Sequence, residues 1–329
     1  MTRVAAVDCG TNSIRLLIAD VDSASGSQVD LDRRMEIVRL GQGVDRTGRL
    51  APDALARTLS ALAGYADRAS ELGVERTRMV ATSATRDASN RDDFVRGVVE
   101  VLGVPPEVVS GDEEARLSFT GATRGLPGDV PGPYLVADIG AGSTELVLGP
   151  PDRTGESVGA SVDGSGRVPG GGTADVTAAV SVDIGCVRLT ERHLHDDPPT
   201  AEQVAAAVAD IEAGLDRAAS VVPLRQARSL VGLAGSVTTV AGIALDLPEY
   251  DAERIHHSRV SAADVRAVAE RLMSSTHAER AAIPVMHPGR VDVIGAGALV
   301  LHRIVERVGL PEVVVSEHDI LDGIAWSLV

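Results

Sequence analysis

Two short segments of the chain combine residue types that suit phosphate and metal binding. Residues 8–13 are Asp-Cys-Gly-Thr-Asn-Ser and residues 138–143 are Asp-Ile-Gly-Ala-Gly-Ser, so both have the pattern D-x-G-x-x-S. Each follows a short apolar run and precedes another, which predicts a turn between two strands. Glycine and small hydroxyl residues let the backbone approach a phosphate closely, and aspartate supplies the oxygen ligands that Mg²⁺ prefers. One copy would be an ordinary hairpin turn, but two copies at matching places predict a functional pair.

A third segment predicts another anion site. An apolar strand leads into Gly-Leu-Ala-Gly-Ser at residues 232–236, and we expect a helix over residues 236–245. The N-terminus of a helix attracts anions through its unpaired N–H groups and its dipole. The alternative is a helix that Ser236 simply caps. Because two other anion loops are present, we interpret Gly235 and Ser236 as phosphate contacts.

Two further segments carry charged residues whose role the spacing leaves open. A predicted helix begins at Asp112, followed by Glu113 and Glu114, and acidic residues stabilise the first turn of a helix. A carboxylate there could instead act as a general base toward water, but spacing alone favours the structural interpretation. Arg86 follows a predicted strand and could bind phosphate oxygens with its planar guanidinium, although a surface cation explains it equally well.

The composition excludes several other mechanisms. The chain has 329 residues, 44% of them hydrophobic, which suits one or two globular domains. No run approaches the roughly 20 apolar residues of a membrane span, and two cysteines are too few for a disulfide framework, so we expect a cytoplasmic protein. The formal net charge of −16 argues against nucleic acid and membrane lipid as partners. All 31 basic residues are arginines, so chemistry that needs a lysine, such as a Walker A loop or a Schiff base, is excluded.

The predicted elements repeat one order in the two halves of the chain. In the first half we expect strands at residues 4–8, 14–21, 36–40, 78–82 and 107–109, and helices at residues 52–72, 89–103 and 112–124. A cluster of Gly and Pro at residues 125–133 then predicts a boundary. After it we expect strands at residues 134–138, 144–148, 179–185 and 229–233, and helices at residues 201–219 and 236–245. This order predicts an α/β protein with two domains, residues 1–128 and 129–329, around a cleft, and with a flexible insertion at about residues 150–176.

Together these motifs resemble the family of exopolyphosphatases and guanosine-pentaphosphate phosphatases, within the larger group of actin-like ATPases and sugar kinases. The resemblance rests on collinear segments at residues 7–21, 81–90, 109–119, 136–149, 183–192, 231–239, 286–297 and 315–324. It implies two ribonuclease-H-like domains and a Mg²⁺-dependent hydrolase that removes terminal phosphate from polyphosphate. Guanosine pentaphosphate is the alternative substrate. A kinase-type enzyme and an actin-like nucleotide-binding module are alternatives of another class.

The resemblance also implies roles for individual residues. Glu114, the second glutamate of its pair, would be the general base, and Arg86 would contact the phosphate chain. Asp138 and Glu145 would organise Mg²⁺, with Asp8 as a further candidate ligand. The phosphate loops would be lined by Asn12, Ser13, Arg15, Gly142, Ser143 and Thr144. The arginines that we expect to gather in the cleft are Arg15, Arg86, Arg188 and Arg290.

Three features depart from the usual pattern of the family. Ala141 stands where the family has the middle one of three glycines, and the segment at residues 150–176 lengthens a connection that is usually short. The sequence ends at Val329, without the additional C-terminal helical domain of longer members, so we expect a preference for short polyphosphate. A homodimer is expected only from the resemblance.

Overall fold

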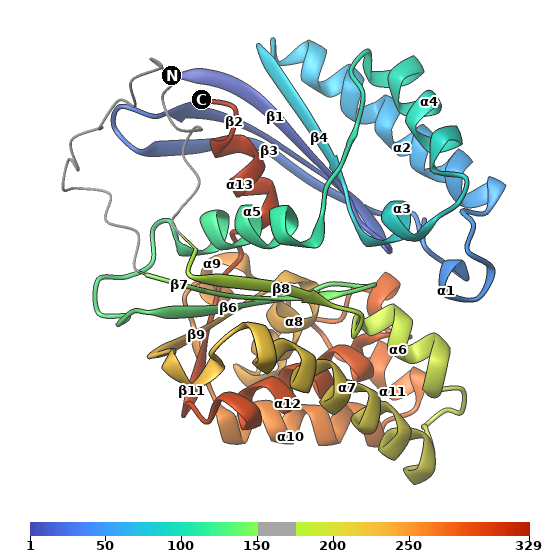
Figure 1. The fold of residues 1–329 in the computed structure, drawn as a ribbon, viewed down its shortest axis with the longest axis vertical. Coiled ribbons are helices and arrows are strands. Elements are labelled where there is room, and N and C mark those ends of the chain that lie inside the picture. The colour runs from blue at the N-terminus through green and yellow to red at the C-terminus, as the bar shows by residue number, and fades with distance from the viewer. Residues whose placement is uncertain (151–175) are drawn as a thin grey trace.

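The computed structural model describes residues 1–150 and 176–329, so the insertion expected at residues 150–176 lies almost entirely outside the described residues. In the described residues the chain forms two β-sheets with helices around and between them (Figure 1). None of the described helices is long and apolar enough to cross a membrane. The two sheets and the helices packed on them confirm the predicted α/β class.

The first sheet has five strands in the order β3-β2-β1-β4-β5. They are β1 (Thr2–Cys9), β2 (Ser13–Asp22), β3 (Ser27–Ile37), β4 (Arg76–Ala81) and β5 (Glu107–Val108). β2 runs antiparallel to β1 and β3, whereas β4 is parallel to β1 and β5. The helices of this half are α1 (Val44–Thr47), α2 (Pro52–Glu71), α3 (Ser83–Asp87), α4 (Arg91–Leu102) and α5 (Gly111–Thr123).

The second sheet has six strands in the order β10-β11-β9-β6-β7-β8. They are β6 (Tyr134–Ile139), β7 (Thr144–Gly149), β8 (Ala178–Val182), β9 (Ser229–Leu233), β10 (Arg259–Ser261) and β11 (Glu312–Val315). The helices of this half are α6 (Cys186–His193), α7 (Ala201–Val221), α8 (Ala234–Ala244), α9 (Ala252–Ile255), α10 (Ala262–Ser274), α11 (His277–Ala281), α12 (Ile294–Val308) and α13 (Ile320–Trp326).

The two sheets repeat one topology. β6, β7 and β8 form an antiparallel meander as β1, β2 and β3 do, and β9 and β11 continue it in parallel as β4 and β5 do. β10 adds an antiparallel strand at the edge. This repeat agrees with the prediction of two related halves. The boundary at residues 128 and 129 stays a prediction, and the last helix, α13, packs against the first sheet.

One strand differs clearly from its prediction. The sequence predicts a strand at residues 36–40, but β3 occupies Ser27–Ile37 and lies at the free edge of its sheet. Its exposed side chains include the charged Asp30, Arg33 and Arg34, so no apolar run marks it in the sequence. Charged residues on an edge strand prevent it from pairing with strands of other chains. Such a strand therefore often lacks the apolar run by which a buried strand is predicted.

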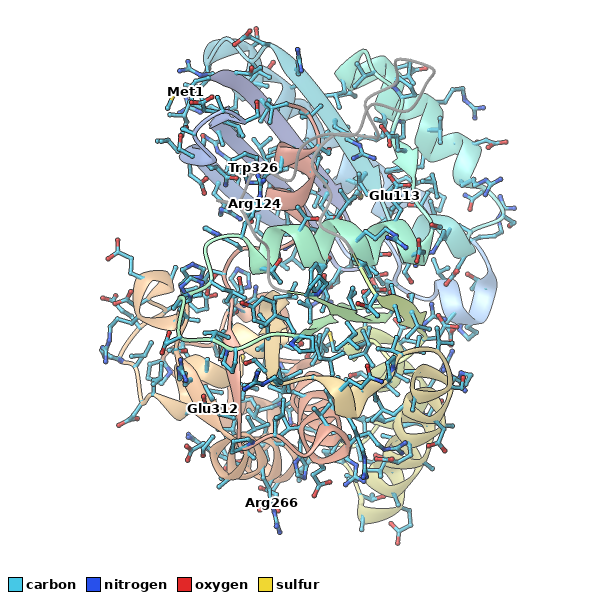
Figure 2. The ribbon with its side chains drawn as sticks, turned by 60° about the vertical axis from the view of Figure 1, so that its left-hand side comes forward. Met1, Glu113, Arg124, Arg266, Glu312 and Trp326 are labelled. Carbon is cyan, nitrogen blue, oxygen red and sulfur yellow. The ribbon has the colours of Figure 1, made fainter. Side chains whose placement is uncertain are left out.

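The helices α5 and α13 cross between the two sheets with their backbones in contact. A Cβ atom at Gly121 would lie 1.8 Å from the carbonyl oxygen of Asp319, so only glycine leaves room for the crossing. Nearby, the guanidinium of Arg124 lies 3.7 Å from the centre of the Trp326 ring (Figure 2). The crossing fixes the position of α5, which carries Glu114 toward the cleft.

Candidate active site

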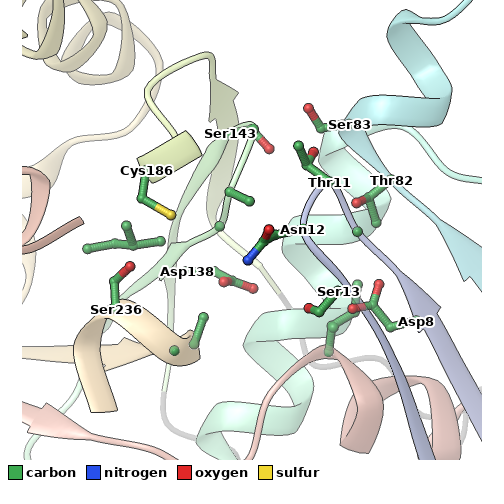
Figure 3. A pocket seen from close by; sticks show the side chains of 18 of the residues that line it. Asp8, Thr11, Asn12, Ser13, Thr82, Ser83, Asp138, Ser143, Cys186 and Ser236 are labelled. Carbon is green, nitrogen blue, oxygen red and sulfur yellow. The ribbon is translucent and has the colours of Figure 1, made fainter. Parts of the chain in front are cut away.

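A cleft lies between the two sheets, where β1 and β6 end (Figure 3). Its walls are the turns that follow these strands, the beginnings of α5 and α8, and the segment that precedes α12. Asp8 and Asp138 enter it from opposite sides. The cleft therefore unites the three segments for which the sequence predicts phosphate binding, namely residues 8–13, 138–143 and 232–236.

The turn at residues 140–143, which follows β6, directs its peptide N–H groups into the cleft. The carbonyl oxygens of Gly140 and Ala141 accept hydrogen bonds from the first amides of α6, at 3.0 Å and 2.9 Å, and that of Gly142 accepts one from Arg188 at 2.7 Å. In a planar trans peptide the N–H points opposite to the C=O, so the amides of residues 141–143 face away from α6. In the described part of the chain these three amides donate to no other group. They are available to an anion in the cleft.

The turn at residues 10–13, which follows β1, is held in a similar way. The carbonyl oxygen of Thr11 accepts a hydrogen bond from Gly41 at 2.8 Å, and that of Asn12 accepts bonds from Val38 and Arg39 at 3.0 Å and 2.8 Å. The following amides therefore point away from the segment at residues 38–41. The two turns touch each other, because a Cβ atom at Gly142 would lie only 2.6 Å from the Thr11 hydroxyl. Between them they form two opposed rows of N–H groups.

The start of α8 forms the third wall. Leu233 is the N-cap residue and supplies no side-chain cap, so the first amides of the helix remain open to a ligand. The alternative in which Ser236 caps this helix is wrong, since the helix begins at Ala234 and Ser236 lies within its first turn. Ala234 has a φ of 71°, a left-handed conformation that is strained for a residue with a Cβ atom. Such strain is frequent where the backbone binds a ligand.

Glu114 reaches the cleft from α5, whereas its neighbour does not. Ser110 caps the helix, and the side chain of Glu113 points outward to Arg78 at 2.7 Å with 47% of it exposed (Figure 2). Glu114 lines the cleft, is 8% exposed and accepts a hydrogen bond from Arg86 at 2.7 Å. Burial raises the pKa of Glu114 to about 7 despite the opposing effect of Arg86. A carboxyl group with this pKa can exchange a proton near neutral pH.

Three more buried carboxyl groups surround Glu114. Asp138 accepts a hydrogen bond from Ser118 at 2.6 Å, and Glu145 accepts one from Ser181 at 2.6 Å. Burial raises the pKa of Asp138 to about 6, with a contribution from Asp8 among others. Burial, followed by the nearby charges of Glu114 and Asp138, raises the pKa of Glu145 well above its ordinary value. The cleft thus concentrates negative charge that a bound cation would relieve.

Asp8 is the best-placed oxygen ligand for such a cation. Its Oδ2 atom accepts two hydrogen bonds from Arg15, at 3.0 Å and 2.7 Å, but its buried Oδ1 atom has no hydrogen-bond partner among the described residues. Burial also raises the pKa of Asp8, against the effect of Arg15. No group of three or more His, Cys, Asp and Glu side chains in the described residues is close enough to hold a metal ion alone. The oxygens of Asp8, Asp138 and Glu145 fit Mg²⁺, which usually keeps several waters and uses one or two carboxylates together with substrate phosphates.

Most of the predicted site residues line the cleft, but two do not. The cleft is lined by Asp8, Asn12, Ser13, Arg15, Glu114, Asp138, Gly142, Ser143, Glu145, Gly235 and Ser236. Thr144 is fully buried and donates its hydroxyl to the carbonyl oxygen of Ile184 at 3.1 Å. Arg86 reaches Glu114 and the carbonyl oxygen of Val109 rather than the cleft surface. Arg86 is therefore a partner of Glu114 in this structure, and the phosphate contact that the resemblance implies for it stays a prediction.

Of the four arginines expected in the cleft, Arg15 and Arg290 line it, whereas Arg86 and Arg188 do not. Arg290 lines the cleft beside the start of α8, where a Cβ atom at Gly235 would lie 2.5 Å from the guanidinium. It donates to the Thr239 hydroxyl at 3.2 Å and forms no salt bridge with a carboxylate in the described part of the chain. Arg15, by contrast, is bound by Asp8 and Asp319. Arg290 is therefore the cleft arginine whose charge remains available to a phosphate. The sequence marked it only as one of four arginines that could gather there.

Comparisons with known proteins extend over nearly the whole chain. The sequence profile of the Ppx/GppA phosphatase family matches residues 17–329. Exopolyphosphatase 2 of Mycobacterium tuberculosis is 50% identical over 339 aligned residues, which cover 100% of this chain and 99% of the relative. The solved structure of an exopolyphosphatase-like protein superposes with a TM-score of 0.89 at 42% identity, covering 99% of this chain and 97% of the other. A Ppx/GppA family member from Aquifex aeolicus superposes with a TM-score of 0.78 at 28% identity, covering 99% and 97%.

Proposed function

The chain belongs to the Ppx/GppA phosphatase family, and on this basis we propose that it hydrolyses the terminal phosphoanhydride bond of inorganic polyphosphate. The relative with 50% identity is an exopolyphosphatase, which supports this substrate. The observation that carries the proposal is the position of Glu114. A buried carboxyl group with a pKa of about 7 faces a cleft whose walls present backbone N–H groups from three segments. This combination suits attack by water on a bound phosphate.

In this mechanism the chain itself does most of the positioning. The amides of residues 141–143 and of the first turn of α8 bind the oxygens of the terminal phosphate, and Arg290 adds a positive charge. Glu114, when deprotonated, accepts a proton from a water molecule and orients it toward the phosphorus. Arg86 holds the carboxylate of Glu114 in place at 2.7 Å. Phosphoryl transfer depends mainly on such positioning and on neutralisation of charge.

A magnesium ion is part of this proposal. Four carboxyl groups but only two guanidinium groups belong to residues that line the cleft, in the part of the chain that the structure describes. A polyanion would be repelled from such a site without further positive charge. One or two of the carboxylates of Asp8, Asp138 and Glu145, together with water and substrate phosphate, would hold Mg²⁺, which would neutralise charge on the phosphate oxygens.

Guanosine pentaphosphate is the second candidate substrate, and a specific cavity favours it. A space of about 470 Å³ continues from the cleft past Arg290 and is lined by Tyr250, Met286 and Val285. The hydroxyl of Tyr250 is held by Thr238 at 2.9 Å, so its ring offers a fixed apolar surface for a base. Membership in a phosphatase family gives the kinase-type and actin-like alternatives no support. A homodimer remains a prediction from the resemblance.

The two substrates can be compared directly. Phosphate release should be measured at equal enzyme concentration from polyphosphate and from guanosine pentaphosphate, each with Mg²⁺. We expect the higher kcat/KM with polyphosphate. A higher value with the nucleotide would make guanosine pentaphosphate the substrate, and no release from either would remove the proposed function.

Short polyphosphate chains should be better substrates than long ones. Beyond the cleft, the arginines at positions 33 and 34 that line the adjoining cavity already pair with Asp322 and Asp32, at 2.7 Å and 3.0 Å. Of the arginines that line this cavity in the described part of the chain, only Arg290 has no salt bridge, so little positive charge remains to hold distant phosphates. The measurement is kcat/KM, expressed per chain end, for tripolyphosphate and for chains of about a hundred phosphates or more. Equal values for both would contradict this prediction.

A further inference from the structure

Arg188 joins the two halves of the molecule at a point away from the chain connections between them. It lies on α6, and its guanidinium pairs with Asp45 on α1 and with Asp87 at the end of α3, the latter at 2.6 Å. Figure 1 shows α1, α3 and α6 together on the right-hand side, whereas the connection from α5 to β6 runs on the left. Only 11% of the Arg188 side chain is exposed. We call this set of contacts the clasp.

The same guanidinium also holds the turn at residues 140–143 that follows β6. The Nε atom of Arg188 donates to the carbonyl oxygen of Gly142 at 2.7 Å. This bond fixes the peptide between Gly142 and Ser143, so it sets the direction of the Ser143 amide. The backbone amides of α6 hold the two preceding carbonyl groups, but a side chain alone holds this one.

The position of Gly142 makes this bond depend on the other half of the molecule. A Cβ atom at Gly142 would lie 2.4 Å from the Ser83 hydroxyl and 2.6 Å from the Thr11 hydroxyl, so the turn fits closely against the first half. Arg188 Nη2 also lies 3.4 Å from the Ser83 hydroxyl. If the two halves separated, the Arg188 guanidinium would therefore lose three partners, Asp45, Asp87 and Ser83.

We propose that Arg188 is a positioning residue that couples closure of the two halves to the orientation of the Ser143 amide toward phosphate. The inference rests on the proposed function, since it assumes that these amides bind the terminal phosphate. When the clasp is closed, Asp45 and Asp87 hold the guanidinium where its Nε atom reaches Gly142. When the clasp is open, the peptide between residues 142 and 143 loses its only side-chain partner in the described structure and can rotate. Arg188 does not line the cleft and acts through the turn.

The test compares Arg188→Gln with Arg192→Gln. Arg192 lies on the same helix and binds the same Asp45 at 2.8 Å, but its other partner is Asp210 on α7, and it has no contact with the turn. For Arg188→Gln we expect kcat on tripolyphosphate to fall about 10- to 100-fold, because small misplacements of a binding group have effects of this size. For Arg192→Gln we expect a change of less than about threefold. Equal effects of the two substitutions would overturn the proposal.

Two further measurements separate positioning from general stability. Arg188→Lys keeps the charge but not the planar fork, so we expect a thermal midpoint closer to that of the wild type than in Arg188→Gln, with kcat still reduced. Recovery of wild-type kcat in this variant would overturn the proposal, because charge alone would then suffice. Asp87→Asn removes one of the two carboxylates that hold the guanidinium against Gly142, so we expect kcat to fall, but by a smaller factor than in Arg188→Gln. An unchanged kcat in Asp87→Asn would overturn the coupling between the two halves and the turn. If Arg188→Gln does not fold, the lysine and asparagine variants still decide the question.

Binding provides a readout that does not require catalysis. Calorimetric titration of tripolyphosphate with Mg²⁺ should be carried out on Glu114→Gln, alone and combined with Arg188→Gln or Arg192→Gln. We expect about tenfold weaker binding only in the combination with Arg188→Gln, as for the loss of one hydrogen bond to a charged group. Equal binding by all three proteins would overturn the inference about Arg188. Absence of hydrolysis by the wild-type protein, with binding preserved, would instead count against the proposed function.

Discussion

Replacing Glu114 by glutamine is expected to lower kcat for phosphate release from tripolyphosphate about 100- to 10,000-fold. Glutamine has the same shape and can still accept the hydrogen bond from Arg86, so the fold and the cleft should be preserved. It cannot accept a proton from water at neutral pH, and the general base is lost. The measurements are kcat from steady-state phosphate release and the Kd of tripolyphosphate, which should change by less than about threefold.

The neighbouring glutamate offers a matched control. Glu113 is on the same turn of α5, but its side chain faces Arg78 on the protein surface. Glu113→Gln should therefore keep kcat within about threefold of the wild-type value, since only an exposed ion pair is lost. If Glu113→Gln lost activity and Glu114→Gln kept it, the assignment of the base would be reversed. Near-wild-type turnover in both variants would place the base elsewhere.

Replacing Gly142 by valine is the second substitution from which we expect a large effect. Its Cβ atom would lie 2.4 Å from Ser83 and 2.6 Å from Thr11, which is closer than real Cβ contacts. The two hydroxyl side chains can rotate but cannot vacate the space of a branched side chain, so the turn must move away from the first half. We expect kcat/KM for tripolyphosphate to fall at least about 100-fold, because the amides of the turn no longer face the phosphate.

A glycine outside the cleft provides the comparison for this substitution. A Cβ atom at Gly128 would have no atom within 4 Å. Gly128→Val should therefore leave kcat/KM within about threefold of the wild-type value. Thermal unfolding of both variants distinguishes displacement of the turn from global unfolding. If Gly142→Val were as active as Gly128→Val, the close contact of the two turns would have no part in catalysis.

Much of the fold follows from the sequence because the central strands are buried on both faces. β1 and β6 are mostly apolar strands whose second-last residue is an aspartate, and this repetition is visible in the sequence alone. The edge strand β3 has no such apolar run, because its contact with solvent allows charged side chains along its length. The return of α13 to the first sheet also could not be predicted. Its packing depends on the contact between Gly121 and Asp319. These two residues are about 200 positions apart in the sequence, so only the three-dimensional structure reveals the contact.

The candidate site is predictable to the extent that backbone loops form it. Repetition of D-x-G-x-x-S identifies Asp8 and Asp138 because each turn carries its own glycine and hydroxyl residues. Side chains that reach the cleft from separate elements leave no such local signal. Arg290 enters from the segment before α12, and the choice of Glu114 over Glu113 depends on how α5 is rotated about its axis. The spacing of residues predicts the helix but not which of its side chains faces the cleft. Here only the family resemblance pointed to Glu114.

The pH dependence of kcat/KM tests the role of Glu114 most directly. Glu114 must be deprotonated to act as a base, and burial raises its pKa from 4.5 to about 7. Because kcat/KM reports the free enzyme, it should rise about tenfold per pH unit below about pH 7 and level off above it. In Glu114→Gln the step near pH 7 should disappear, leaving only a weaker dependence from Asp138, whose pKa burial raises to about 6. A wild-type profile that is flat between about pH 5 and pH 8, or one that is unchanged in the variant, would contradict the proposed role of Glu114.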